Sequence, residues 1–155
     1  SSWSYRSMLG GVLAQETDRA VETKEEMKPV TKVVPTEGEL EDLVFATKLV
    51  KHSKSNAIVL AKGGQLIASG VGQTSRVDAL KQAIEKARHF GFELQGAVLA
   101  SDAFFPFDDC VTLAAEAGIT AIAQPGGSVR DADSIAAADA HGIAMVMTGV
   151  RHFKH

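Results

Sequence analysis

The sequence predicts an α/β protein, a layered αβα domain around a mixed sheet of about five strands. Apolar runs at 97–100, 119–123 and 143–147 alternate with alanine-rich helical segments at about 109–117 and 130–141. Such alternation is typical of crossover units, with parallel strands and helices on both faces. Two earlier apolar runs flank a glycine pair, as in a hairpin. With 155 residues, 45% of them hydrophobic, the chain can form one core.

The composition limits the class of function. The net charge is −3, from 16 basic and 19 acidic residues mixed along the chain, which argues against nucleic-acid or membrane-surface partners. The single cysteine, Cys110, excludes an internal disulfide, and no residues have metal-ligand spacing. The sequence shows neither a membrane-spanning run nor a secretory signal, so we expect a cytoplasmic protein.

Residues 1–35 are expected to form an extended segment and a solvated connector, and residues 36–155 the folded domain. The many charges of residues 16–29 predict the connector, which joins extended segments near Val12 and at 30–34. The opening Ser1–Ser4 has no periodicity, and we expect the chain to start inside a larger protein.

The first helix is predicted from Thr36 to near Ser53. Thr36 and Glu39 have capping-box spacing, in which each side chain satisfies a free amide at the helix start. Lys51 and His52 would complement the dipole at the helix end. The buried stripe, at i, i+3, i+4 and i+7, comprises Leu40, Leu43, Val44, Thr47 and Val50.

A hairpin and a second helix should follow. The runs 57–61 and 66–69 flank 62–65, where paired glycines allow a tight turn. The second helix should begin at about Ser75 and stop at Gly91, with Val77, Leu80, Ala83, Ile84 and Ala87 on its buried face.

Three loops should lie at the carboxyl ends of the parallel strands, where open α/β sheets bind ligands. Residues 101–109 hold three aromatic rings and three carboxylates, which suit a heteroaromatic ligand. Equally, this loop could plug the core, with Asp108 or Asp109 capping a helix.

The other two loops also have two interpretations. The amides of 124–130 could receive an anion, although a plain strand-to-helix turn is favoured. The basic segment 151–155 suits a phosphate, or is a solvated tail. Residues 70–76 do not match the dinucleotide pattern, which excludes a nicotinamide or flavin site.

Five motifs together resemble one family, the bifunctional purine biosynthesis enzyme that joins AICAR transformylase to IMP cyclohydrolase. They are Lys-x-x-x-Ser-Asn at 51–56, Gly-x-Gly-Gln-x-Ser-Arg at 70–76, Ser-Asp-Ala-Phe-Phe-Pro-Phe at 101–107, Gln-Pro-Gly-Gly-Ser at 124–128 and the closing Arg-x-Phe-x-His at 151–155. The resemblance implies the second, cytidine-deaminase-like half of the transformylase domain, which takes a formyl group from 10-formyltetrahydrofolate to AICAR.

The resemblance also implies roles for individual residues. The AICAR nucleotide would contact Asn56, Arg76, Phe104 and Arg151, with Arg151 on its phosphate. His155 and Asn56 would lie near the reacting groups. The folate side would be lined by Val77, Asp109, Ser128 and Val129.

Further implications concern cofactors and partners. The resemblance implies no zinc, a possible monovalent cation, and a homodimer whose partners include the remaining half of the transformylase domain and the cyclohydrolase domain. The family's catalytic lysine and histidine would lie in that other half, at a position different from Lys51–His52. Cys110 stands where some relatives have a polar amide. A non-catalytic nucleotide-binding module and a structural half-domain are alternatives.

Overall fold

The fold is a six-stranded mixed sheet with helices on both faces. A computed structural model describes residues 24–105 and 109–149. Its elements are a 3-10 helix η2 (Lys24–Glu26), β1 (Lys28–Pro29), α1 (Glu37–Lys51), β2 (Ile58–Lys62), β3 (Gln65–Gly70), α2 (Arg76–His89), β4 (Val98–Ser101), α3 (Asp109–Ala117), β5 (Ala121–Gln124), α4 (Asp131–His141) and β6 (Ala144–Met147). The strand order is β1-β6-β5-β4-β2-β3. Strands β4, β5 and β6 are parallel, whereas the pairs β1–β6, β2–β3 and β2–β4 are antiparallel.

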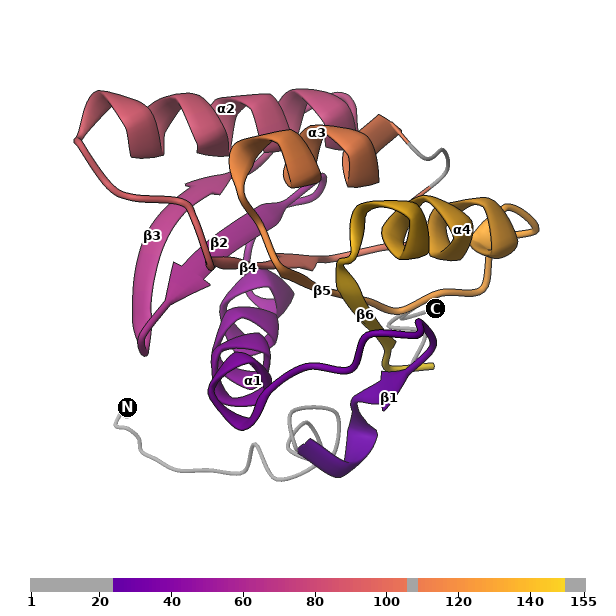
Figure 1. The fold of residues 1–155 in the computed structure, drawn as a ribbon. Coiled ribbons are helices and arrows are strands. Elements are labelled where there is room, and N and C mark those ends of the chain that lie inside the picture. Colours follow the sequence, from indigo (N-terminus) through magenta and orange to yellow (C-terminus); the bar gives the residue numbers. More distant parts are fainter. Residues whose placement is uncertain (1–23, 106–108, 150–155) are drawn as a thin grey trace, which may run out of the picture.

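The sheet separates two apolar layers, as the sequence predicts. Helix α1 covers one face alone, and α2, α3 and α4 lie side by side over the other (Figure 1). The α1 layer contains Leu43, Val50, Val59 and Val146. The opposite layer is larger and includes Leu80, Leu99, Phe105, Ile122 and Met145. Alternation of side chains along each strand supplies both layers, which is why the parallel strands are apolar except at their last residues, Ser101 of β4 and Gln124 of β5.

Local signals in the sequence form the elements they predict. The Thr36 hydroxyl accepts the Glu39 amide, and the Glu39 carboxylate accepts the Thr36 amide, so the capping box of α1 is present. Gly63 and Gly64 have φ of 61° and 77° in the two-residue turn of the β2–β3 hairpin. Ser75 caps α2 through the Asp78 amide.

The amino-terminal region differs from the expectation. The predicted extended segment at 30–34 is not a strand; the strand is β1, two residues at 28–29, and it raises the sheet to six strands. One residue of the predicted connector, Met27, is buried: it is only 4% exposed and packs in the α1 layer. The high charge density of residues 16–29 predicts exposure on average, and it does not identify Met27 as a buried apolar side chain.

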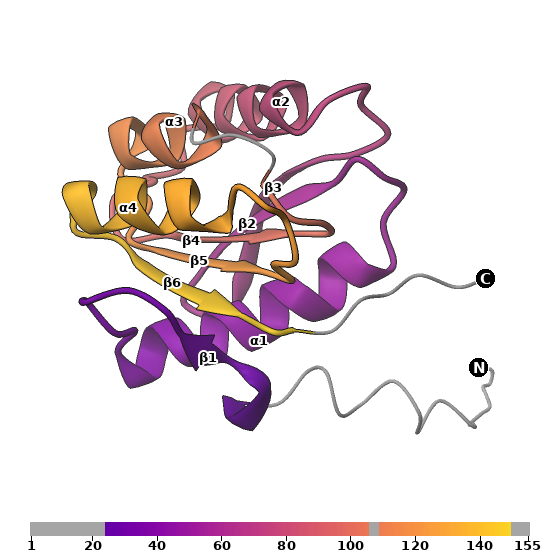
Figure 2. The same cartoon turned by 90° about the vertical axis from the view of Figure 1, so that its right-hand side faces the viewer.

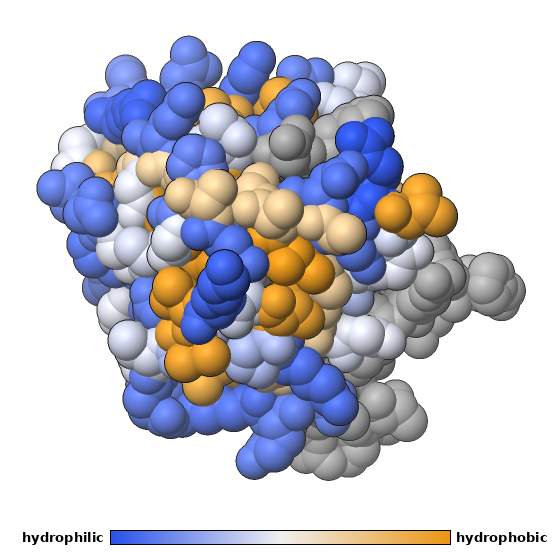
Figure 3. Space-filling view, turned by 45° about the vertical axis from the view of Figure 1, so that its right-hand side comes forward, coloured by the Kyte–Doolittle hydropathy of each residue, from blue (hydrophilic) through white to orange (hydrophobic). Residues whose placement is uncertain are grey.

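The surface of the described residues carries several large exposed apolar side chains. Val33, Val34 and Phe90 are among them. Figure 3 shows apolar residues gathered near the β1 edge of the sheet within a hydrophilic rim. Within residues 24–105 and 109–149, no helix combines the length and apolar character needed to cross a membrane.

One edge of the sheet collects most of the sequence motifs. Strands β4, β5 and β6 end at the same side of the molecule (Figure 2). Because β2 is antiparallel to β4, it begins at this side, with Ile58 opposite Ser101. Gly70 pairs with Ile58, so β3 ends there too. We call this side the carboxyl edge.

Candidate functional site

Asp102 joins three segments at the carboxyl edge. Its Oδ1 accepts the Ala57 amide at 3.2 Å, and its Oδ2 accepts the Ser55 hydroxyl at 2.5 Å. The Asp102 amide in turn donates to the Ala57 carbonyl at 3.2 Å. The side chain is 10% exposed, so these bonds lie in a poorly solvated place where they are strong. Asp102 therefore fixes the loop before β2 against the loop after β4.

Arg76 reaches the same carboxylate from the start of α2. Its Nε lies 3.8 Å from Asp102 Oδ1, and the side chain is 17% exposed. That Nε is buried and has no hydrogen-bond partner among the described residues. A guanidinium held by one carboxylate on its Nε side keeps its terminal amino groups for an anionic or carbonyl ligand.

Asn56 belongs to the same cluster. Its Nδ2 donates to the Gln73 carbonyl at 3.0 Å, and the two backbones are also paired. Because Ser55 and Ala57, on either side of Asn56, both bond Asp102, the position of Asn56 is set from both sides. The structure thus brings Asn56, Arg76 and the loop that carries Phe104 around one carboxylate.

A pocket of about 170 Å³ opens beside Asp102, between α1 and the carboxyl edge. Most of its lining residues are polar, and Thr47 Oγ1 is buried there without a partner among the described residues. Lys51 also lines it, so this lysine has a place beside the site as well as at the end of α1. The lining residues are Thr47, Val50, Lys51, Ser53, Ser55, Ser101, Asp102, Ala123, Gln124, Pro125 and Thr148.

The two described rings of the aromatic loop have different environments. Phe105 is fully buried and packs in the larger apolar layer, whereas Phe104 is half-buried. Phe105 therefore plugs the core, as one interpretation of the loop expects, and the other interpretation, a ligand contact, stays a prediction for Phe104. Phe107 and Asp108 lie outside the described residues.

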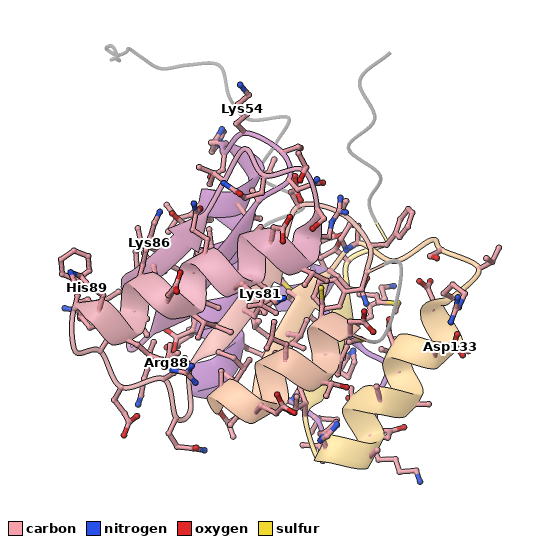
Figure 4. The ribbon with its side chains drawn as sticks, turned by 90° about the horizontal axis from the view of Figure 1, so that it is seen from above. Lys54, Lys81, Lys86, Arg88, His89 and Asp133 are labelled. Atoms are coloured by element: carbon pink, nitrogen blue, oxygen red, sulfur yellow. The ribbon has the colours of Figure 1, made fainter. Side chains whose placement is uncertain are left out.

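Two residues of the expected folate side share a groove. Val77 and Asp109 line it together with Lys81 and Leu113, between α2 and α3. Figure 4 shows Lys81 between these helices. Asp109 is the first residue of α3 and is exposed, so its carboxylate is available for a polar ligand edge.

The loop after β5 has no free amide at Gly127 or Ser128. The Asp131 carboxylate accepts the Gly127 amide at 2.8 Å and the Ser128 amide at 3.1 Å. These two amides are therefore occupied within the loop, which agrees with the favoured strand-to-helix turn. Ser128 is half-buried and Val129 is 99% exposed, and neither lines the Val77–Asp109 groove.

Cys110 is buried beside the site. Burial raises the pKa of its thiol to about 11, while the Arg76 guanidinium lowers it and Asp109 raises it further. At neutral pH the group is therefore a neutral thiol that packs as a small apolar side chain.

We expect Cys110 to react with iodoacetamide at pH 7.5 at least about 100-fold more slowly in the native chain than in urea, since the thiolate is the nucleophile.

The raised pKa of Cys110 also makes stability depend on pH. The ordinary thiol pKa is 9.0, so the pKa of Cys110 is higher in the folded chain than in the unfolded chain. The protonated Cys110 thiol therefore contributes fully to the free energy of unfolding below pH 9, and this contribution is lost as pH rises from 9 towards 11. Urea unfolding of the wild type and Cys110→Ala at pH 8 and pH 10.5 measures it; an equal loss of stability in both would contradict the assignment.

The two terminal residues implied by the resemblance, Arg151 and His155, lie outside the described residues. Within the described ranges, no group of three His, Cys, Asp or Glu side chains could hold a metal ion. Sequence reasoning gave no individual role to three participants: Asp102, Ser55 and the unpartnered hydroxyl of Thr47. The available signal was the position of Asp102, directly after a buried strand; Thr47 looked like one member of an apolar stripe.

Fold and site define an α/β domain whose edge loops form a polar cluster beside a pocket, a class that serves many chemistries. The sequence identifies the family. A family model described as AICARFT/IMPCHase bienzyme matches residues 1–86, and the chain belongs to this family.

Full-length relatives show the same relationship. The bifunctional purine biosynthesis protein PurH of Bacteroides thetaiotaomicron is 65% identical over 97% of this chain and 30% of its own length. The PurH proteins of Aquifex aeolicus and Acetivibrio thermocellus are 54% and 56% identical, each over 99% of this chain and 30% and 29% of theirs. The chain thus spans about 30% of the length of these relatives.

Solved structures of two deaminases align with this chain at low sequence identity. The dCMP deaminase of cyanophage S-TIM5 aligns with a TM-score of 0.49 and 17% identity, over 64% of this chain and 88% of its own. A guanine deaminase from Nitrosomonas europaea gives 0.48 and 17%, over 92% of this chain and 89% of its own.

Proposed function

We propose that this chain supplies part of the active site of an AICAR formyltransferase, which transfers a formyl group from 10-formyltetrahydrofolate to AICAR. The observation that supports it is the cluster around Asp102, which unites Asn56, Arg76 and the Phe104 loop at one edge. An aminoimidazole needs an aromatic wall and amide partners, and a nucleotide phosphate needs a guanidinium. These groups are present on the residues that the family resemblance names.

The folate co-substrate is assigned to the groove between α2 and α3 and to the loop after β5. Asp109 offers an acceptor carboxylate for a pterin edge, and Val77 an apolar contact. Ser128 and Val129 would contact the same ligand from their separate loop. The apolar side chain of Val129 is fully exposed, and a ligand or partner surface would cover it.

Catalysis needs groups beyond this cluster. The exocyclic amine of AICAR is a weak nucleophile, so formyl transfer needs a positioned base and stabilisation of a developing oxyanion. His155 and Asn56 would lie near the reacting groups, and the main catalytic lysine and histidine would come from the remaining transformylase half. We propose a cytoplasmic homodimer with the site at a subunit interface, and little turnover by the chain alone.

A formyl-transfer assay tests this division. The chain alone should show little turnover with AICAR and 10-formyltetrahydrofolate, and addition of the complementary half should restore it. Robust turnover by the chain alone would refute the division of labour. Binding of AICAR without turnover in the mixture favours a non-catalytic nucleotide-binding module, and absence of any AICAR binding favours a structural half-domain.

Replacement of Arg151 by alanine should weaken AICAR binding by about 1.5 to 3 kcal/mol, because charged hydrogen bonds to the phosphate are lost. Calorimetric titration measures the change. Arg88→Ala is the matched control, because Arg88 is exposed on α2 and is not among the residues proposed to contact AICAR. Equal affinities of the two variants would remove Arg151 from the site.

We propose the pocket beside Asp102 as the place for a monovalent cation. Its Thr47, Ser53 and Ser55 hydroxyls and the Asp102 carboxylate are oxygen donors, which hard cations prefer. At ten times its Kd, K⁺ would stabilise the chain by about 1.4 kcal/mol, or roughly 3 to 6 °C in Tm. Thermal unfolding in KCl and in choline chloride of equal ionic strength tests this. An equal Tm in both salts would exclude the site, and Asp102→Asn should abolish any difference.

A further inference from the structure

Gln124, the last residue of β5, is buried at the carboxyl edge and has no role in the function proposed above. Its side chain is 1% exposed, which is rare for an amide and requires that its polar atoms be satisfied. It belongs to the lining of the pocket beside Asp102. A buried polar side chain in this position is expected to hold neighbouring segments of the site in place.

The contacts of Gln124 join the ends of three strands. Its Oε1 accepts the Phe105 amide at 3.0 Å, in the loop after β4. Its Nε2 lies 3.3 Å from Met145 Sδ of β6. Its own carbonyl accepts the Thr148 amide at 3.1 Å, just after β6. The amide orientation follows from the first bond, because an N–H of Phe105 requires an acceptor.

The bond to Phe105 fixes the aromatic loop at one point. The Phe105 ring is fully buried, so the ring and the amide of this residue are held independently. The Asp102 carboxylate holds the loop three residues earlier. Phe104 lies between these anchors, and successive Cα atoms are only about 3.8 Å apart. The Phe104 backbone therefore has little freedom, and its ring is presented from a fixed point.

We infer that Gln124 is a positioning residue for Phe104 and, through it, for the base of the bound nucleotide. This rests on the proposed function, in which Phe104 contacts the aminoimidazole ring. Glutamine suits the task because it supplies a buried acceptor without burying a charge. Substitution of Gln124 should weaken only the contacts to the base of the nucleotide. Gln124 bonds the Phe104 loop and makes no hydrogen bond to Arg76 or Asn56 among those described.

The test compares Gln124→Met with Gln124→Glu. Methionine has the same length and no comparable acceptor, whereas glutamate keeps the acceptor for the Phe105 amide and, buried as the neutral acid, adds no charge. We expect Gln124→Met to weaken AICAR binding about 10-fold in calorimetric titration, and Gln124→Glu to stay within about 3-fold of wild type. Binding of ribose 5-phosphate, which lacks the base, should be unchanged in both. A general loss of structure would weaken both ligands.

A double-mutant cycle with Phe104→Leu separates this inference from the function on which it rests. In the Phe104→Leu background, Gln124→Met should cause no further loss of AICAR affinity. If Phe104→Leu weakens AICAR and Gln124→Met does not, the inference is wrong and the function stands. If Phe104→Leu itself has no effect, the contact in the proposed function fails. Should Gln124→Met not fold, Gln124→Asn, one methylene shorter, replaces it in the same cycle.

Discussion

Replacement of Asp102 by alanine is expected to destabilise the chain by about 2 to 3 kcal/mol. The change leaves the Ala57 amide without its acceptor and the Arg76 guanidinium without its counter-ion, both in a largely buried place. Breaking one member of a buried charged network costs the desolvation of the members that remain. The estimate is below the range for fully buried pairs, because Arg76 is 17% exposed and 3.8 Å away. Urea unfolding followed by circular dichroism measures the loss.

Asp133→Ala is the matched control for Asp102→Ala. Asp133 also pairs with an arginine, Arg130, but both side chains are about half-exposed. Exposed pairs contribute little, so we expect a loss below about 0.5 kcal/mol. Asp102→Asn should lie between the two, since an amide oxygen can still accept the Ala57 amide. If Asp102→Ala costs no more than Asp133→Ala, Asp102 does not organise the site.

Gly70→Ala should destabilise the chain by about 3 kcal/mol or more. A Cβ at Gly70 would lie 2.0 Å from the Ala79 carbonyl oxygen and 2.7 Å from its carbon. These are backbone atoms of α2, so relief requires the helix to move away from β3, and overpacking of this kind is costly. Because α2 begins with Arg76, the same movement would shift the guanidinium away from Asp102 and weaken AICAR binding.

Gly38→Ala should change the free energy of unfolding in the opposite direction, towards higher stability. Gly38 lies in α1 with nothing within 4 Å of an added Cβ. Alanine is the better helix former, so this variant should gain about 0.5 kcal/mol. Urea midpoints and m values of the two variants make the comparison. A Gly70→Ala chain as stable as wild type would show that β3 and α2 are not packed as described.

Most of the fold could be predicted because periodicity and end signals agree. The capping box at Thr36, the glycine pair at 63–64 and the predicted span 109–117 all correspond to observed features. The strand β1 could not be predicted, because two residues carry no period and their pairing with β6 is decided by tertiary contact. The same holds for Met27, whose burial depends on α1.

The site was predicted less completely than the fold. Motifs pointed to Asn56, Arg76 and Phe104, and the structure brings their segments together. Asp102 and Gln124 were not singled out for a role, because a buried hydrogen-bond partner is defined by residues distant in sequence. The side-chain acceptor of the Gly127 amide could not be predicted for the same reason, although the strand-to-helix turn itself was favoured.

The central claim is that the loops of the carboxyl edge form part of a nucleotide site around Asp102. Calorimetric titration of AICAR into the wild-type chain and into Arg76→Ala tests it most directly. We expect saturable one-to-one binding by the wild type and a loss of at least about 10-fold in the variant, as for a hydrogen bond to a charged group. Absence of binding by the wild type, or equal affinity in both, would contradict the claim.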